Sequence, residues 1–317
     1  SAKTAISTLS RTSATAIWST SRLSPTARHI KTRSDPQPYR PDGPVYIESK
    51  LLSKIKERKY TIMGYPSDIL STRAIIKPGK FVVIPPEGLV NNVIPGIEGC
   101  KVSIVASPKY GASFVQYLVT AEPNGGTTKK FGTESNIETF MYICEGHGSF
   151  TVDGKEYDAP EGAYIYAPAG VGIEFKNTGS EPMKAILYKQ VFIPAEGVGQ
   201  PYVYYGNVND MEYAYYDNME NVFIKDLLPV DKAFDMNMHI LSFAPGGCHP
   251  FVETHVQEHG MYILEGEGVY LLDDEWKMIK KDDFVWFGAF CPQAAYGCGR
   301  TNFTYIYSKD CNRDVNL

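Results

Sequence analysis

Residues 137–146 read IETFMYICEG, and residues 257–266 read QEHGMYILEG. Six of the ten positions are identical, and each matched pair is separated by 120 residues. The same offset aligns Gly162 with Asp282 and Ile173 with Gln293 in a second pair of segments. An offset shared by two separate stretches indicates an internal repeat, so we expect two copies of one fold.

Each copy contains short runs of β-branched and aromatic residues that are bounded by Gly, Pro, Asn or Asp. Residues 148–154 (GSFTVDG) and 163–167 (AYIYA) correspond to residues 268–273 (GVYLLD) and 284–287 (FVWF). Helical periodicity is scarce outside a charged stretch at residues 48–59. Many short strands at even spacing predict an all-β fold, either a sandwich or a barrel, in each half.

The overall composition is that of an ordinary globular protein. Of the 317 residues, 43% are hydrophobic and 21% are charged, and the net charge is −5. A nucleic-acid-binding protein would favour a basic surface, so we expect no nucleic-acid partner. No apolar run approaches the roughly 20 residues that a spanning helix needs, so we expect no membrane segment.

The first 34 residues differ from the rest because they contain Lys and Arg but no Asp or Glu. This Ser- and Arg-rich composition is typical of an organelle transit peptide, and a disordered extension of a cytoplasmic protein is the alternative. A Pro-rich linker follows at residues 34–44. We therefore expect an extension at 1–45, an N-terminal barrel at 46–190 and a C-terminal barrel at 191–317.

Possible metal ligands occur at regular spacing in the second half. Gly247 is followed by Glu253, His255, His259 and Gly266, and Gln293 lies further along. This spacing resembles the cupin signature G-x5-H-x-H-x3-E-x6-G with its later histidine, although the ligand types are permuted. The resemblance implies two tandem jelly-roll barrels, a bicupin, with few short helices.

Strand geometry explains why this spacing suits one ion. Side chains at i and i+2 of a strand face the same side, so Glu253 and His255 both point inward. His259 keeps that parity, and Gln293 reaches the same space from a facing strand. Two imidazoles, a carboxylate and an amide, with no thiolate, favour Mn²⁺ or Fe²⁺ over a structural zinc. Such a site keeps a net positive charge that favours an anionic substrate.

The first half lacks these donors. The offset of 120 places Thr133, Ser135, Thr139 and Ile173 at the four positions. We therefore expect the metal and the active site in the C-terminal barrel alone. His239 and His249 lie near the pattern but outside it, and we interpret them as supporting or structural residues.

Longer stretches of both halves resemble the (S)-ureidoglycine aminohydrolase family. They are residues 91–96 (NNVIPG), 111–115 (GASFV), 234–246 (FDMNMHILSFAPG), 253–259 (ETHVQEH) and 305–315 (YIYSKDCNRDV). The resemblance covers nearly everything after about residue 62. It implies a manganese enzyme of purine catabolism that converts (S)-ureidoglycine and water to (S)-ureidoglycolate and ammonia.

The resemblance also implies roles for individual residues. Glu253, His255, His259 and Gln293 would be the metal ligands, and Tyr270, Tyr305 and Lys309 would contact the substrate. Lys309 suits the substrate carboxylate as a cation. Glu253 is also our candidate for proton transfer, with Lys309 as a second catalytic residue.

Two other functions remain open at this level. One is a different metal-dependent cupin enzyme, such as an iron dioxygenase, and the other is a non-catalytic bicupin of the storage type. We expect a small-molecule substrate and a homo-oligomer, because bicupins commonly assemble through barrel faces.

Overall fold

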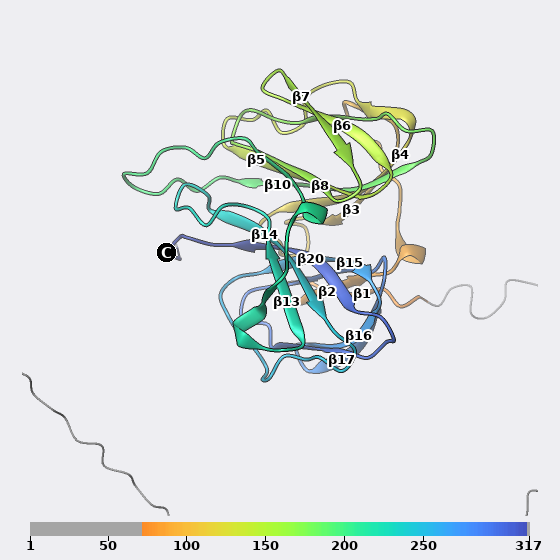
Figure 1. Cartoon of the computed structure of the whole chain (residues 1–317), viewed down its shortest axis with the longest axis vertical. Helices are drawn as coiled ribbons and strands as arrows, with labels where there is room; N and C mark the ends of the chain where they lie inside the picture. The colour runs from red at the N-terminus through yellow and green to blue at the C-terminus, as the bar shows by residue number, and fades with distance from the viewer. Residues whose placement is uncertain (1–71, 316–317) are drawn as a thin grey trace, which may run out of the picture. The chain divides into compact units, whose positions relative to one another are not determined.

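The computed structural model describes residues 72–315, which form twenty strands and three 3₁₀ helices (Figure 1). The expected extension at residues 1–45, the charged stretch at 48–59 and the start of the expected first barrel lie outside the described residues. Within the described part, no helix has the length and apolar character needed to cross a membrane. The expectation of an all-β fold with few short helices is confirmed.

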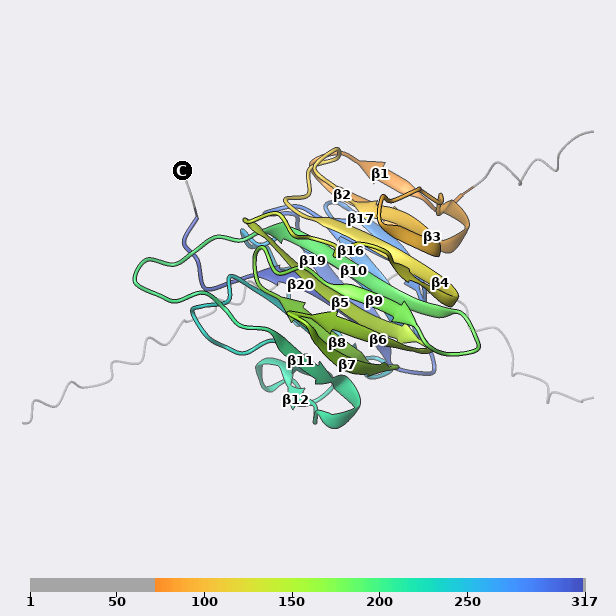
Figure 2. The same ribbon diagram turned by 90° about the horizontal axis from the view of Figure 1, so that it is seen from above.

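The first half is built on a nine-stranded sheet with the order β11-β8-β5-β10-β4-β9-β6-β7, and β3 pairs with β4 (Figure 2). Its strands are β3 (Ile97–Ala106), β4 (Val115–Thr127), β5 (Ile137–Glu145), β6 (His147–Val152), β7 (Lys155–Pro160), β8 (Ala163–Ala167), β9 (Glu174–Asn177), β10 (Met183–Val191) and β11 (Tyr204–Asn207). The sheet surrounds an apolar core that includes Met141, Phe150 and Ile165. We call this unit the N-terminal barrel.

The second half contains an eight-stranded sheet, β1-β2-β18-β15-β20-β14-β13-β12, and a three-stranded sheet, β17-β16-β19. Their strands are β1 (Ile75–Lys77), β2 (Phe81–Ile84), β12 (Ala214–Tyr215), β13 (Val222–Asp226), β14 (Met236–Phe243), β15 (His259–Glu265), β16 (Glu267–Leu272), β17 (Glu275–Lys280), β18 (Phe284–Phe287), β19 (Gln293–Gly297) and β20 (Phe303–Asp310). The 3₁₀ helices are η1 (Pro86–Gly88), η2 (Val208–Asp210) and η3 (Tyr216–Asn218). The two sheets share an apolar core that includes Met261, Leu272 and Phe303, and we call this unit the C-terminal barrel.

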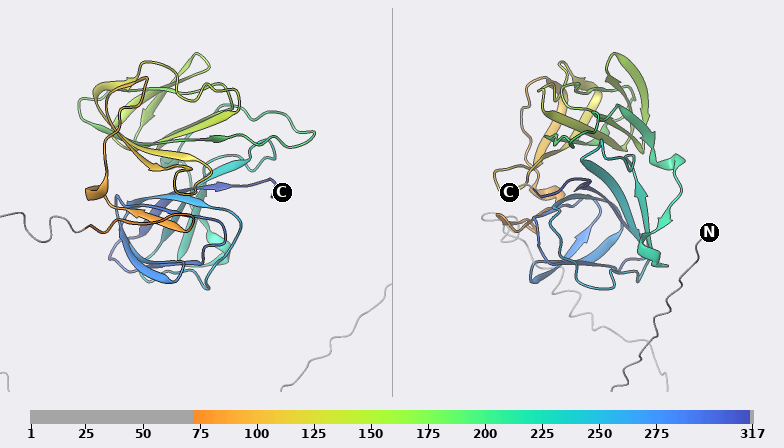
Figure 3. Two further views of the ribbon diagram at one scale, coloured as in Figure 1. Left: turned by 180° about the vertical axis from the view of Figure 1, so that it is seen from behind. Right: turned by 90° about the vertical axis from the view of Figure 1, so that its left-hand side faces the viewer.

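Strand pairing crosses the expected boundary at residue 190. Strands β1 and β2 come early in the chain, yet β2 pairs with β18 in the C-terminal barrel, with Phe81 opposite Phe287 (Figure 3). In the other direction, β11 pairs with β8 of the N-terminal barrel. The division into 46–190 and 191–317 is therefore wrong for these strands. An edge strand has unpaired backbone groups, and here each barrel receives an edge strand from the other half of the chain.

A third apolar cluster contains residues from both halves, among them Val105, Phe140, Tyr188, Phe234 and Trp286. Polar bonds also cross between the halves: the Lys184 Nζ of β10 lies 3.0 Å from the Asp282 Oδ1 beside β18. We call the region around this cluster the inter-barrel interface. Because it is buried and apolar, the two barrels pack as one unit.

Candidate active site

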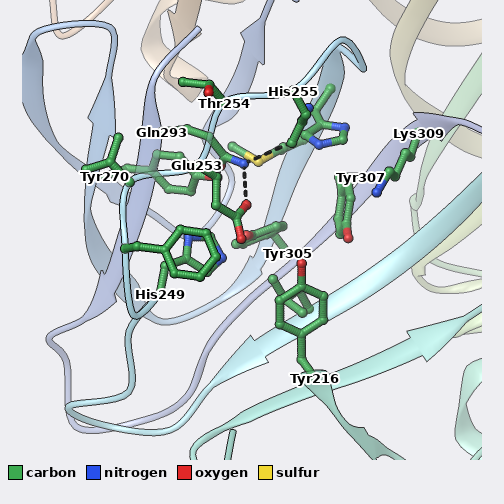
Figure 4. Close-up of a pocket in the computed structure, with 15 residues that line it drawn as sticks. Tyr216, His249, Glu253, Thr254, His255, Tyr270, Gln293, Tyr305, Tyr307 and Lys309 are labelled. Atoms are coloured by element: carbon green, nitrogen blue, oxygen red, sulfur yellow. Dashed lines mark hydrogen bonds between the residues drawn. The ribbon is translucent and has the colours of Figure 1, made fainter. Parts of the chain in front are cut away.

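A cavity of about 390 Å³ opens in the C-terminal barrel between β15, β19, β20 and the loop before β15 (Figure 4). Every residue that the sequence predicted for the site lines this cavity: Glu253, His255, His259, Tyr270, Gln293, Tyr305 and Lys309. The structure thus brings together residues that are up to 56 positions apart, from Glu253 to Lys309. None of the seven predicted site residues lies outside this cavity.

The loop before β15 is held against β19 by backbone hydrogen bonds. Glu253 N donates to the Gln293 carbonyl at 2.8 Å, and Gln293 N donates to the Glu253 carbonyl at 2.9 Å. His249 N donates to the Ala295 carbonyl at 3.0 Å, two residues further along β19. This short ladder sets Glu253 directly opposite Gln293, although the loop is not a regular strand.

The polar ends of Glu253, His255 and Gln293 point toward one another, and the His259 ring lies beside that of His255. Gln293 Nε2 lies 2.8 Å from Glu253 Oε2 and 3.3 Å from His255 Nε2 (Figure 4). The rings of His255 and His259 are 4.9 Å apart between centroids. The Tyr270 hydroxyl donates to Gln293 Oε1 at 2.5 Å.

Backbone carbonyls orient both histidine rings. His255 Nδ1 lies 2.9 Å from the Gln257 carbonyl, and His259 Nδ1 lies 2.8 Å from the Ser308 carbonyl. A carbonyl can only accept, so each Nδ1 carries the hydrogen and each Nε2 keeps a lone pair. An outer hydrogen bond of this kind is typical of metal-binding histidines.

These donors fit a cation on one condition. Among residues 72–315, no three His, Cys, Asp or Glu side chains converge closely enough to hold an ion by themselves. At this cavity the Gln293 amide nitrogen lies between Glu253 and His255. Its N–H groups point to the place where a cation would need an oxygen or nitrogen lone pair. A half-turn of the amide exchanges its nitrogen for its oxygen, which is a ligand atom. The set is therefore suitable for a hard or borderline divalent ion once the amide has turned.

Burial sets the protonation of the site. It lowers the pKa of His255 and, more strongly, that of His259, and the nearby charge of Lys309 lowers both further. The imidazoles are therefore neutral near pH 7, which is the form that binds metal ions. Burial also raises the pKa of Glu253, although Lys309 opposes that shift. The buried hydroxyls of Tyr270 and Tyr305 have pKa values raised well above the usual range, so they remain donors.

Four further polar residues that the sequence did not predict line the cavity: Tyr216, His249, Thr254 and Tyr307. Tyr307 could have been found, since it lies midway between Tyr305 and Lys309 on β20 and shares their face. His249, which the sequence indicates as a supporting or structural residue, is buried with no hydrogen-bond partner for Nδ1 among the described residues. Tyr216 belongs to η3, which no motif indicated.

His239 lies outside the cavity, as expected for a residue outside the pattern. Its Nδ1 lies 2.6 Å from Asp226 Oδ1, and its ring stacks on Tyr307 with a centroid separation of 5.1 Å. It is the cross-strand partner of Tyr307 and therefore packs beside the cavity wall on the same face of the sheet.

Two of the four equivalent positions in the N-terminal barrel are buried and two are exposed. Ile173 is fully buried within the apolar core, and Thr139 is also fully buried. Thr133 and Ser135 lie in the loop before β5 and are exposed. The absence of a comparable ligand set in this half stays a prediction.

Comparison with known proteins gives a consistent result. The family model described as "Cupin domain" matches residues 117–188. The chain is 49% identical over 257 residues to (S)-ureidoglycine aminohydrolase of Escherichia coli K12, covering 81% of this chain and 98% of that protein. It is 25% identical over 245 residues to (S)-ureidoglycine aminohydrolase of Arabidopsis thaliana, covering 77% and 79%.

A solved structure shows the same fold. The crystal structure of the protein Ylba from E. coli superposes with a TM-score of 0.71 at 48% sequence identity, covering 80% of this chain and all of that one. High identity over nearly the full length of a curated relative, together with the shared fold, decides the family. The chain belongs to the (S)-ureidoglycine aminohydrolase family, whose members are enzymes of the cupin fold.

Proposed function

We propose that this chain hydrolyses (S)-ureidoglycine to (S)-ureidoglycolate and ammonia with one Mn²⁺ ion held by Glu253, His255, His259 and Gln293. In this reaction the bond from the central carbon to the amine breaks, and a water oxygen takes its place. The observation that carries the proposal is the convergence of these donors with Lys309 in one cavity, in a chain 49% identical to the E. coli enzyme.

The donor set supports the choice of ion. The set contains two neutral imidazoles, one carboxylate and one amide, and no thiolate. Such a set suits both Mn²⁺ and Fe²⁺, and we propose Mn²⁺. When bound, the ion supplies Lewis-acid chemistry that anchors and polarises the substrate. The single carboxylate leaves a net positive charge at the site, which favours an anionic substrate.

The remaining side chains have complementary tasks. Lys309 is the only Lys or Arg that lines the cavity within residues 72–315, and it pairs with the substrate carboxylate. Tyr270 and Tyr305 donate from hydroxyls that stay protonated. Glu253 exchanges a proton between the incoming water and the leaving amine, because it is the only Asp or Glu that lines the cavity within the described residues.

The test is ammonia release from freshly generated ureidoglycine by the purified chain. We expect release that a chelator abolishes and that added Mn²⁺ restores, with the S form of ureidoglycolate as product. Release that is unaffected by complete metal removal would contradict the metal part of the proposal. Absence of release by the manganese-loaded protein would contradict the reaction.

The same preparation separates the two alternatives. An iron dioxygenase would consume O₂ during turnover and would require iron, whereas the proposed hydrolysis uses no oxygen. A non-catalytic bicupin would purify without stoichiometric metal and would release no ammonia. Metal analysis and an oxygen electrode on one sample therefore distinguish all three.

A further inference from the structure

We propose that Tyr216 recognises the ureido end of the substrate and makes this cavity select ureido acids over short acids that lack the group. The inference rests on the proposed function for the identity of the substrate, and it assigns a specificity role to a residue outside the ligand motifs. Tyr216 comes from η3, in the connection between β12 and β13, rather than from the strands that carry the predicted ligands.

The cavity has one cationic region. Lys309 is its only Lys or Arg within the described residues, and it will hold the carboxylate of any small acid. Figure 4 shows the Tyr216 hydroxyl pointing into the cavity toward Glu253, with Lys309 on a different side. A substrate whose carboxylate lies at Lys309 therefore extends its other arm toward a neutral donor. A ureido group is neutral and offers a carbonyl oxygen, so a phenol hydroxyl is a suitable partner.

The other tyrosines of the cavity are less suited to this task. The Gln293 amide engages the Tyr270 hydroxyl whichever way it is turned: the hydroxyl donates to Oε1 at 2.5 Å here, and after a half-turn of the amide it accepts from Nε2. Tyr305 packs against it, with ring centroids 6.2 Å apart, and is 2% exposed. Tyr307 lies two residues before Lys309 on the same face of β20, which places it at the carboxylate side. The Tyr216 hydroxyl has no hydrogen-bond partner among the described residues, so it is available to a ligand.

The backbone around Tyr216 is held in an uncommon conformation. Asp217 (φ 46°) and Asn218 (φ 59°) are both left-handed, and the turn is closed by Met219 N, which donates to the Tyr216 carbonyl at 2.9 Å. Left-handed non-glycine residues are costly and tend to occur at ligand-binding positions, although Asp and Asn tolerate them best. The result is that Tyr216 faces the cavity, while its neighbour Tyr215 is 65% exposed.

The test compares two ligands by calorimetry on the manganese-loaded full chain. N-Carbamoylglycine has the carboxylate and the ureido group but no amine to lose, so it binds without reacting; glycolate has the carboxylate and a hydroxyl but no ureido group. Tyr216→Phe should raise the Kd for N-carbamoylglycine about tenfold, the value of one hydrogen bond, and change the Kd for glycolate less than twofold. With ureidoglycine, the same variant should raise KM about tenfold and leave kcat within a few fold, because the ureido end does not react.

Tyr215→Phe is the matched control, since it removes the neighbouring hydroxyl from the exposed side, and it should change neither Kd. Equal weakening of both ligands by Tyr216→Phe would show that the residue only shapes the cavity. An unchanged Kd for N-carbamoylglycine would show that the hydroxyl does not touch the ureido group. Either result overturns the inference but leaves ammonia release intact, whereas absence of ammonia release from the unmodified chain overturns the proposed function.

Discussion

Single side chains in this cavity have chemistry that depends on what surrounds them. Gln293 is the clearest case, because its amide bridges Tyr270 on one side and Glu253 on the other. The same amide offers either a donor or an acceptor to the centre of the cavity, according to which way it is turned. Tyr270 is therefore a residue that orients a predicted ligand, in addition to any contact with substrate.

Replacing Glu253 by Gln separates ligation from proton transfer. An amide oxygen can still coordinate, but an amide cannot take up or release a proton at neutral pH. We expect Glu253→Gln to retain much of its manganese and to lose turnover by about 100-fold or more. Metal content by mass spectrometry and ammonia release on one sample check this. Turnover retained with metal bound would remove Glu253 from the proton-transfer step.

Replacing Lys309 by Met removes the cation and keeps a side chain of similar length. A hydrogen bond to a charged group is worth about 1.5–3 kcal/mol, so KM for ureidoglycine should rise by roughly 10- to 100-fold. Lys109→Met, at an exposed position of the other half, is the control and should leave KM unchanged. A KM that stays near the unmodified value would place the substrate carboxylate elsewhere.

At the scale of the element, β2 shows how an early strand supports a late site. It pairs with β18, and β18 pairs with β15, where His259 lies opposite Phe287. Phe81 of β2 is fully buried in the core of the C-terminal barrel. A predicted metal ligand thus depends on a strand that ends 175 residues before it.

We therefore expect Phe81→Ala to destabilise the C-terminal barrel by about 3–5 kcal/mol, the usual cost of removing a buried aromatic ring. When unfolding in guanidinium is monitored by metal release, the midpoint should shift to a lower denaturant concentration. Ile76→Ala in β1 is the control: Ile76 is 58% exposed, and the change should be within about 0.5 kcal/mol. If Phe81→Ala left the midpoint of metal release unchanged, β2 would not support the site.

At the scale of the whole molecule, the internal repeat explains the inter-barrel interface. Glu138 and Glu258 are matched positions of the two copies, and both accept hydrogen bonds at this interface. Glu258 accepts from Ser113 N of the other half at 2.8 Å and from Trp286 Nε1 at 2.7 Å. Glu138 accepts from the Tyr166 hydroxyl at 2.5 Å. The repeated glutamate therefore serves the packing of the barrels and not the cavity.

Glu138 also makes the interface sensitive to pH. Its carboxyl is fully buried near Asp235 of the other half, and burial together with that negative charge raises its pKa well above the usual range. Burial raises the pKa of Asp235 too, so the pair holds a proton that the unfolded chain would release. Because the folded state binds more protons, the stability from this pair is complete below the unfolded pKa of about 4.3 and is lost as pH rises through the folded pKa.

Glu138→Gln removes the titrating proton and keeps the shape and hydrogen-bonding capacity. We expect the free energy of unfolding to decline less steeply with increasing pH than in the unmodified chain, so the variant gains relative stability on the alkaline side. Denaturant unfolding in a pH series from 5 to 9 measures the slopes. Glu156→Gln, at an exposed position of β7, is the control and should reproduce the unmodified slope. Identical slopes for Glu138→Gln would rule out a shared proton.

Local chemistry in the sequence determined much of this protein. The 120-residue repeat predicted two copies of a β fold, and spacing within one loop and one strand predicted residues that line a single cavity. The repeat follows from strand and turn patterns that act over a few residues. The strand parity expected for Glu253 and His255 is wrong, because both lie in the loop before β15 and not in a strand. Tertiary structure alone decided that β2 and β11 exchange barrels and that Tyr216 enters the cavity. These features depend on which sheet edges and buried groups meet in space, and no local pattern records distant partners of that kind.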